Sequence, residues 1–396
     1  MKVIRNQRFW ELGSILGSAL GLPAMIVGGS LAKEYGPGAA FTSICIGNFI
    51  LWMIGLGIIS MTEGKAHAIE NIKNYLGKKA GIAAALVLIC ALLIWYALQI
   101  KGAAGALIPI LEYDPWTLGI ILGGIVALLS FGGINLIKRI CVFGLPLLLC
   151  FVIYSLVIAK SHALFSQPLS FSFSAILTVI LVWLPGVVNL PTFFRHAASK
   201  ADAILGLSLI MIIHIFFQAF TILLGIDTPE KIFSLGTKGL AMGFVLLSFL
   251  CINLVNIYAA SVAWESIFPR HKNAKEYVVV GLLGTLTYIL LYFSFPLAFL
   301  EIIASSFIAS LGVVLLIDFL MKVIVKHRPR ALEKTWSSLS WLVGCLAAIF
   351  TAIQLPSHPE DSLIAGPCAS ILIFLCILFI EETTWSIKAL MFNCKK

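Results

Sequence analysis

The stretch VWLPGVVNLPTFFR, residues 182–195, lies in a long apolar run and carries helix breakers near the middle of that run. Pro185, Gly186 and Pro191 each disfavour the regular helix by which a hydrophobic segment normally crosses a bilayer. Irregular backbone at membrane depth is tolerated only where it packs inside protein or lines a wet cavity, because its freed N–H and C=O groups need partners. The stretch therefore indicates a helix interrupted at a binding site, or else a helix that is kinked where it packs.

The composition places this stretch in a membrane protein. Of the 396 residues, 60% are hydrophobic and 11% are charged, whereas a soluble domain carries about 25% charged residues. We therefore interpret the chain as an all-α polytopic membrane protein. Apolar runs long enough to cross a bilayer number about 12, at residues 9–33, 38–62, 80–110, 115–137, 140–159, 171–194, 202–226, 237–266, 277–295, 297–325, 336–356 and 361–381.

Basic residues are distributed unevenly between the two sides of these spans. The formal net charge is +9, and most of the 27 Lys and Arg residues fall in the termini and alternate loops that share one side. The opposite loops hold Lys33, Lys160, Lys231 and Lys238. Because cytoplasmic loops are enriched in Lys and Arg, we expect both termini to be cytoplasmic. No loop is long enough to form a basic domain, so nucleic acid is not an expected partner.

A second span with breakers occurs at the start of the chain. Residues 20–29 read LGLPAMIVGG and hold Pro23 and the Gly28-Gly29 pair. This span precedes the span at 171–194 by five, an odd number, so the two enter the membrane from opposite sides. Such a pair is typical of transporters built from inverted repeats, although simple kinks in packed helices remain the alternative. We predict one transmembrane domain over residues 1–396, a 5+5 inverted repeat with broken helices 1 and 6, with repeat 1 at about 9–159, repeat 2 at about 171–325 and two extra spans at about 336–381.

Two further spans carry side chains suited to holding a ligand. Trp95 and Gln99 are four residues apart and share a helix face, where an indole stacks well on a flat ring and an amide hydrogen bonds its edge. Asn253 and Asn256 are three residues apart and face the bundle, because amides without partners are costly in hydrocarbon. Ordinary packing of the tryptophan and helix–helix hydrogen bonds of the amides are the alternatives.

Two charged residues within spans are candidates for an ion-coupling role. Asp318 lies one turn before Lys322, so an i,i+4 ion pair is the alternative to a proton relay. Lys101 lies in the outer half of a long helix, where a snorkelling side chain is the alternative to a buried role. The nine cysteines form no C-x-x-C pair and the histidines no H-x-x-x-H pair, so we expect no metal site. No nucleophile–base pair stands out, so we expect no catalytic residues, no cofactor and no enzyme activity.

Taken together, these residues resemble the nucleobase–cation symporter-1 family, the cytosine permease and hydantoin transporter group of the amino acid–polyamine–organocation superfamily. GGSLAKEYGPGAAFTSICIGN at 28–48 resembles the family's Gly-Gly pair followed by Ile-Gly-Asn in span 2. In the stretch that ends on Arg195, the aromatic twelve residues earlier is Trp183, as in the family pattern. IASLGVVLLIDFLM at 308–321 resembles the family's P-P-x-G-G-V-x-x-A-D-Y segment. The order and spacing of these motifs carry the resemblance over most of the chain.

The resemblance implies the broken-helix fold of that superfamily. It also implies a site in which a flat heterocycle stacks between Trp95 and Trp183. Gln99 and Asn253 would supply hydrogen bonds, as would main-chain groups around Trp183 and Gly186. Asn256, Gly28 and Gly29 complete the predicted substrate site.

Several positions depart from the family pattern. The hydroxyl residues that help to coordinate sodium in span 8 correspond to Cys251 and Ile252, and neither is a hard oxygen ligand. Sodium is therefore disfavoured as the coupling ion, although main-chain carbonyls of the first span remain, and protons or no ion are the alternatives. The family's other residues are replaced by Leu92, Thr192 and Ala309-Ser310. A cytosine-specific pocket is not implied.

Three functional hypotheses follow. The first is a permease of the bacterial inner (plasma) membrane that imports a nucleobase or a related cytosine-, purine- or hydantoin-like heterocycle by alternating access. The second is an amino acid or amine transporter of the same superfamily, with a carboxylate held at the helix ends of span 1. The third is a membrane sensor that binds a ligand without moving it. The expected partners are the lipid bilayer and a small-molecule substrate, and the sequence carries no indication of an oligomeric state.

Overall fold

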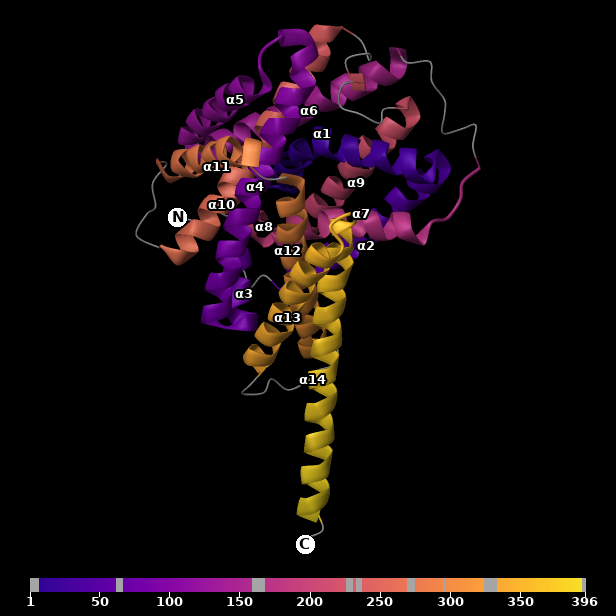
Figure 1. The fold of residues 1–396 in the computed structure, drawn as a ribbon, viewed down its shortest axis with the longest axis vertical. Coiled ribbons are helices and arrows are strands. Elements are labelled where there is room, and N and C mark those ends of the chain that lie inside the picture. Colours follow the sequence, from indigo (N-terminus) through magenta and orange to yellow (C-terminus); the bar gives the residue numbers. More distant parts are fainter. Residues whose placement is uncertain are drawn as a thin grey trace.

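The computed structural model describes residues 7–61, 67–158, 168–225, 231–232, 237–268, 275–294, 297–323 and 333–393. Within these ranges the chain is helical and forms no β-strand, which confirms the predicted all-α class (Figure 1). Residues 1–6 and 394–396, for which a cytoplasmic location is predicted, lie outside the described ranges.

The helices follow one another with short connections. In chain order they are α1 (Phe9–Tyr35), α2 (Pro37–Ser60), α3 (Ala68–Leu76), α4 (Lys78–Leu111), α5 (Pro115–Leu129), α6 (Gly133–Ile158), α7 (Phe173–Val188), α8 (Pro191–Phe194), α9 (Lys200–Leu224), α10 (Lys238–Ile267), α11 (Lys275–Ser294), α12 (Leu297–Val323), α13 (Glu333–Gln354) and α14 (Ser362–Asn393).

The number of membrane crossings agrees with the sequence. By length and hydropathy, the described residues hold 11 candidate spans, one of which covers Pro115–Ile158. That segment contains both α5 and α6, which meet at a short 3-10 turn (Ser130–Gly132) and at Gly133, whose φ of +62° suits a glycine. The two helices pack on different partners, α5 on α4 and α11, and α6 on α1 and α10. They are therefore separate helices, and counting each as one crossing gives the 12 expected.

The helix packing follows an inverted repeat. In an inverted repeat α1 corresponds to α7, α2 to α9 and α6 to α12. The contact of α1 with α9 is matched by the contact of α7 with α2, and the contact of α1 with α6 by that of α7 with α12. The third spans of the two halves, α4 and α10, pack directly on each other. Exchanging the halves thus reproduces the same pairs, as a pseudo-two-fold relation requires. α13 and α14 pack on each other and on α12, outside the repeats, and the end of α14 projects from the bundle (Figure 1).

The two spans with breakers differ in structure. α7 ends at Val188, a turn follows, and α8 begins at Pro191, so the sixth span is interrupted as predicted. α1, by contrast, continues from Phe9 to Tyr35 with Pro23 inside it, and the expected interruption of the first span is not observed. Its tight packing on α9 accounts for this, because a Cβ on Gly28 would lie 2.3 Å from the Gln218 carbonyl oxygen.

Several basic helix ends meet at one side of the bundle, which we call the basic face and define by Arg8, Lys73, Lys138, Arg195 and Lys322. The Lys73 ammonium of α3 donates to the carbonyl of Ser266 at the end of α10, at 2.9 Å. The Lys322 ammonium at the end of α12 lies 4.5 Å from the ring centroid of Tyr75 in α3. Lys138 of α6 forms an ion pair with Glu11 of α1. These residues come from the loops and helix ends for which a cytoplasmic location is predicted.

Candidate functional site

A cavity of about 280 Å³ lies inside the bundle, walled by α1, α2 and α9 together with α4, α7, α10 and α12. Its lining is mostly apolar, with side chains such as Leu20, Met211 and Val255 and few polar groups. Small-molecule sites typically measure about 300–1,000 Å³, so this cavity suits a compact ligand. Five of the predicted substrate-binding residues line it, namely Trp95, Gln99, Trp183, Gly186 and Asn256.

Trp183 provides one aromatic wall of the cavity. Its indole stands edge-on to the imidazole of His214 from α9, with ring centroids 4.2 Å apart and planes at 82°. This T-shaped contact holds the indole plane in a fixed orientation. The Trp183 Nε1–H and the His214 Nε2 are buried and have no hydrogen-bond partner among the described residues. Two polar atoms beside the aromatic wall are thus left for a ligand or water.

Trp95 provides a second aromatic side chain, and it is tied to a carboxylate. The Trp95 Nε1–H donates to the Glu301 Oε1 of α12 at 3.1 Å, and the Ser305 hydroxyl donates to the same oxygen at 2.8 Å. Both Trp95 and Glu301 line the cavity. Because α4 and α12 come from different repeats, this contact joins the two halves of the molecule at the site.

The interrupted span shapes the wall around Gly186. After Gly186 the backbone forms i→i+3 hydrogen bonds, as in a 3-10 helix. The Asn189 N–H donates to the Gly186 carbonyl and the Leu190 N–H donates to the Val187 carbonyl, each at 3.2 Å. A Cβ built on Gly186 would meet no atom within 4 Å, because this glycine borders the open cavity. On the facing helix, Pro23 has no N–H to donate to the Ala19 carbonyl, and both residues line the cavity.

The remaining predicted site residues lie away from the cavity. Gly28 and Gly29 are buried where α1 packs, and Gly28 is occupied in the contact with α9 described above. Asn253 is fully buried, and neither atom of its amide has a partner among the described residues. Lys101 is exposed on α4. Asp318 is buried and forms an ion pair with Lys322 at 3.1 Å, as the i,i+4 spacing allows.

The residues that would hold a sodium ion near α10 do not fit that ion. Cys251 is buried beside the Cys141 thiol of α6 and the Ser18 hydroxyl of α1, while Ile252 lines the cavity. The nearby Ser248 hydroxyl already accepts the Leu22 N–H at 2.7 Å. Two thiols are soft ligands, whereas sodium prefers hard oxygens.

Sequence reasoning did not find two of the polar cavity residues, His214 and Glu301. Glu301 is the one acidic residue in the apolar segment LAFLEIIASSF at 297–307, and an ionisable residue within a membrane span is itself an indication of function. His214 has a weaker indication, because a single histidine in an apolar helix is also common in cores. Its role at the site depends on its contact with Trp183.

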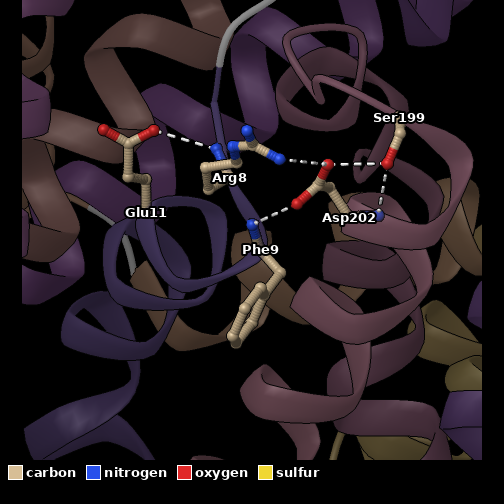
Figure 2. A network of polar contacts seen from close by, with 5 residues as sticks. All are labelled: Arg8, Phe9, Glu11, Ser199 and Asp202. Atoms are coloured by element: carbon tan, nitrogen blue, oxygen red, sulfur yellow. Dashed lines mark hydrogen bonds and ion pairs between the residues drawn. The ribbon is translucent and has the colours of Figure 1, made fainter.

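A polar network around Asp202 joins the start of α1 to the start of α9 (Figure 2). The Asp202 carboxylate near the start of α9 accepts the Phe9 N–H at 3.1 Å and the Ser199 hydroxyl at 2.6 Å, and Arg8 lies 4.0 Å from it. The Arg8 N–H in turn donates to the Glu11 carboxylate at 2.9 Å (Figure 2). The start of α1 is therefore fastened to α9 by side chains.

A second set of contacts reinforces this connection. The Gln7 N–H donates to the His196 carbonyl at 3.1 Å, and the Ala198 N–H donates to the Gln7 carbonyl at 2.9 Å. The Arg195 guanidinium donates to the Tyr258 hydroxyl at 3.1 Å, linking the interrupted span to α10. Nearby, burial and, to a smaller extent, the positive charges of Arg195 and Lys73 together lower the pKa of His67 to about 3. His67 is therefore neutral at physiological pH and adds no charge to the basic face.

We expect Asp202→Ala to loosen the start of α1. The variant loses the acceptor of the Phe9 N–H and the partner of Arg8. Because a hydrogen bond to a charged group is stronger than one to a neutral group, trypsin cleavage after Arg8 should accelerate roughly tenfold or more in the variant. Asp114→Ala is the matched control, since Asp114 caps α5 by accepting the Thr117 N–H. Equal cleavage rates in the two variants would show that Asp202 does not hold α1 closed.

Comparison with solved structures supports the fold, whereas comparison of the sequence finds no match. No protein-family model matches the sequence, and no curated protein matches it either. Among solved structures, Mhp1, a nucleobase-cation-symport-1 family transporter in a closed conformation with bromovinylhydantoin bound, matches with a TM-score of 0.69 at 15% identity, over 96% of this chain and 95% of that chain. The chain has the fold of these transporters. The fold that the resemblance implies is thereby confirmed.

Two other comparisons place the fold more broadly. A Na+-coupled sialic acid symporter in a substrate-bound outward-open state matches with a TM-score of 0.69 at 15% identity, over 93% of this chain and 89% of that chain. A manganese transporter of Eremococcus coleocola matches with a TM-score of 0.59 at 13% identity, over 94% of each chain. Transporters for chemically different substrates thus share this fold, so the substrate must be inferred from the cavity.

Proposed function

We propose that this protein is a secondary transporter of a nucleobase or a related flat heterocycle, working by alternating access. The observation that carries the proposal is one compact cavity between the repeats that brings together Trp95 and Trp183 with the amides of Gln99 and Asn256. Aromatic side chains bind flat rings by stacking, and amides orient them through hydrogen bonds to the ring edge. The protein acts in the bacterial inner membrane, with its basic face toward the cytoplasm.

The unpartnered polar atoms around the cavity support a polar planar ligand. The Trp183 Nε1–H, the His214 Nε2 and the Asn256 Nδ2 are all buried and lack partners among the described residues. Buried polar groups without partners are costly, so a ligand that supplied acceptors and donors would be favoured over an aliphatic one. The apolar remainder of the wall matches the faces of an aromatic ring.

The fastening of α1 supports a gating role for the basic face. α1 and α7 both line the cavity, and in inverted-repeat transporters such helices rock around a central site. The network of Arg8, Glu11 and Asp202 would have to open for the substrate to leave toward the cytoplasm. Release of these contacts is then part of the transport cycle.

A ligand panel tests the proposed function. The purified protein would be titrated with cytosine, uracil, adenine, guanine, hypoxanthine, hydantoin and allantoin, and with amino acids and aliphatic amines, by thermal shift and tryptophan fluorescence. We expect a flat heterocycle to raise the melting temperature and quench tryptophan, because it would stack on Trp183. Binding should be equal in sodium and potassium buffers, since Cys251 is a poor sodium ligand. Failure of every heterocycle would contradict the proposal.

An amine or amino acid transporter of the same fold is the second candidate. Glu301 favours it, because a carboxylate beside aromatic rings is also suited to an ammonium group. Binding of amines or amino acids in the panel, without binding of heterocycles, would establish this candidate in place of the first.

A further inference from the structure

Glu301 is the one formally charged side chain among the residues that line the cavity. His214 is the other titratable group of the lining. Its ring contacts Trp183, whereas Glu301 hydrogen bonds Trp95 and Ser305. Within the described part of the chain, no lysine, arginine or histidine forms an ion pair with Glu301. The cavity therefore carries a carboxyl group that the protein itself leaves without a counter-charge.

The hydrogen bonds to Glu301 define which oxygen is available. The indole N–H of Trp95 and the hydroxyl of Ser305 both donate to Oε1. An indole nitrogen can only donate, so Oε1 is fixed as an acceptor and the carboxylate is held in one orientation. The second oxygen, Oε2, has no hydrogen-bond partner among the described residues. It remains free to accept from a ligand.

The position of Glu301 is costly unless a ligand compensates it. A carboxylate inside a membrane bundle loses most of its hydration, and two hydrogen bonds restore only part of that loss. A ligand that brings N–H donors and positive charge to Oε2 forms a charge-assisted hydrogen bond, which is shorter and stronger than a neutral one. A ligand that presents a carbonyl oxygen there meets repulsion and leaves the carboxylate without a donor.

We propose that Glu301 is the specificity-determining residue of the cavity and that it selects flat heterocycles with an amidine-type edge, an amino group beside a ring nitrogen, in the neutral or protonated form. The inference rests on the proposed function and narrows its substrate class. Trp95 has two roles in this selection, since its ring lines the cavity while its N–H orients the carboxylate. Gln99, one turn further along α4, supplies hydrogen bonds to the rest of the ring.

Matched ligand pairs test this selection directly. Cytosine and uracil differ at one edge, where an amino group and ring nitrogen replace a carbonyl and N–H, and guanine and hypoxanthine differ by an amino group. Using the full-length protein in nanodiscs and tryptophan quenching, we expect the amino member of each pair to bind about tenfold more tightly or better. Glu301→Gln should reduce that preference to about twofold or less, because its amide N–H group would donate to the carbonyl member and would no longer favour the amino member.

Two further variants separate selection from folding. Glu301→Asp keeps the charge and should keep the preference for the amino member at lower affinity, because its carboxylate is set back by one methylene. Glu360→Gln changes an exposed carboxylate that lies outside the cavity, in the turn before α14, and it should leave the preference intact. Melting curves without ligand check that each variant is folded.

The outcomes distinguish this inference from the proposed function. If heterocycles bind but the wild-type protein does not discriminate within the pairs, or if Glu301→Gln keeps the preference, the selection by Glu301 is overturned while the proposed function stands. If no heterocycle binds and aliphatic amines do, both the heterocycle class and the proposed function are overturned. Tenfold discrimination that disappears in Glu301→Gln supports both.

Discussion

Trp183→Ala is expected to weaken heterocycle binding by roughly 5- to 150-fold while the protein remains folded. Stacking of a nucleic acid base on an aromatic side chain contributes about 1–3 kcal/mol when measured by alanine substitution, and this corresponds to that range of affinity. Trp183 borders the cavity and contacts His214 edge-on, so removing the indole enlarges a space that is already open. The substitution should therefore reduce the binding affinity more than the stability of the fold.

The measurement is a binding titration by isothermal calorimetry, since fluorescence loses part of its probe in this variant. Trp10→Ala serves as the control, because Trp10 is 47% exposed at the start of α1 and is remote from the ligand. The control should bind as the wild type does. Unchanged affinity in Trp183→Ala would remove the stacking arrangement, whatever ligand the cavity accepts.

Gly28→Ala is expected to destabilise the protein strongly, although it adds a single methyl group. The new Cβ would lie 2.3 Å from the Gln218 carbonyl oxygen and 2.8 Å from the Gln218 Cα, and backbone atoms of a packed helix cannot move aside cheaply. Overpacking of this kind costs about 1–3 kcal/mol and sometimes more. The thermal melting temperature and the yield of folded protein in detergent should both fall.

Gly186→Ala is the matched control for this change. Its Cβ would meet no atom within 4 Å because the residue borders the cavity, so the melting temperature should stay close to that of the wild type. A larger side chain, as in Gly186→Leu, should fill part of the cavity and abolish binding without unfolding the protein. Equal melting temperatures for Gly28→Ala and the wild type would contradict the close contact of α1 with α9.

Most of the fold could be predicted because a membrane span is defined by the apolar composition of a stretch of about 20 residues. The twelve apolar runs and the odd separation of the two spans with breakers were enough to infer an inverted repeat, and the helix pairs agree with it. The continuity of α1 could not be predicted. Pro23 and the Gly28-Gly29 pair are compatible both with a broken helix and with a continuous helix that packs on a neighbour. That neighbour, α9, is far away in sequence, so no local pattern reveals it.

The candidate site was predictable where spacing on one helix decides which residues share a face. Trp95 and Gln99, four residues apart, both line the cavity, as does Trp183 in the interrupted span. Asn253 and Asn256 were grouped by the same argument, yet only Asn256 reaches the cavity, because a helix face is wider than the opening it borders. Glu301 and His214 depend on how α12 and α9 rotate toward the site, which no local pattern specifies.

Uptake into proteoliposomes tests the central claim most directly. The purified protein would be reconstituted, and the heterocycle that binds best would be offered in radiolabelled form under an inward proton gradient, with Trp183→Ala alongside. We predict saturable accumulation above the external concentration, independent of sodium and absent from the variant. Saturable binding without accumulation, under every gradient, would contradict transport and would mean that the protein senses its ligand instead.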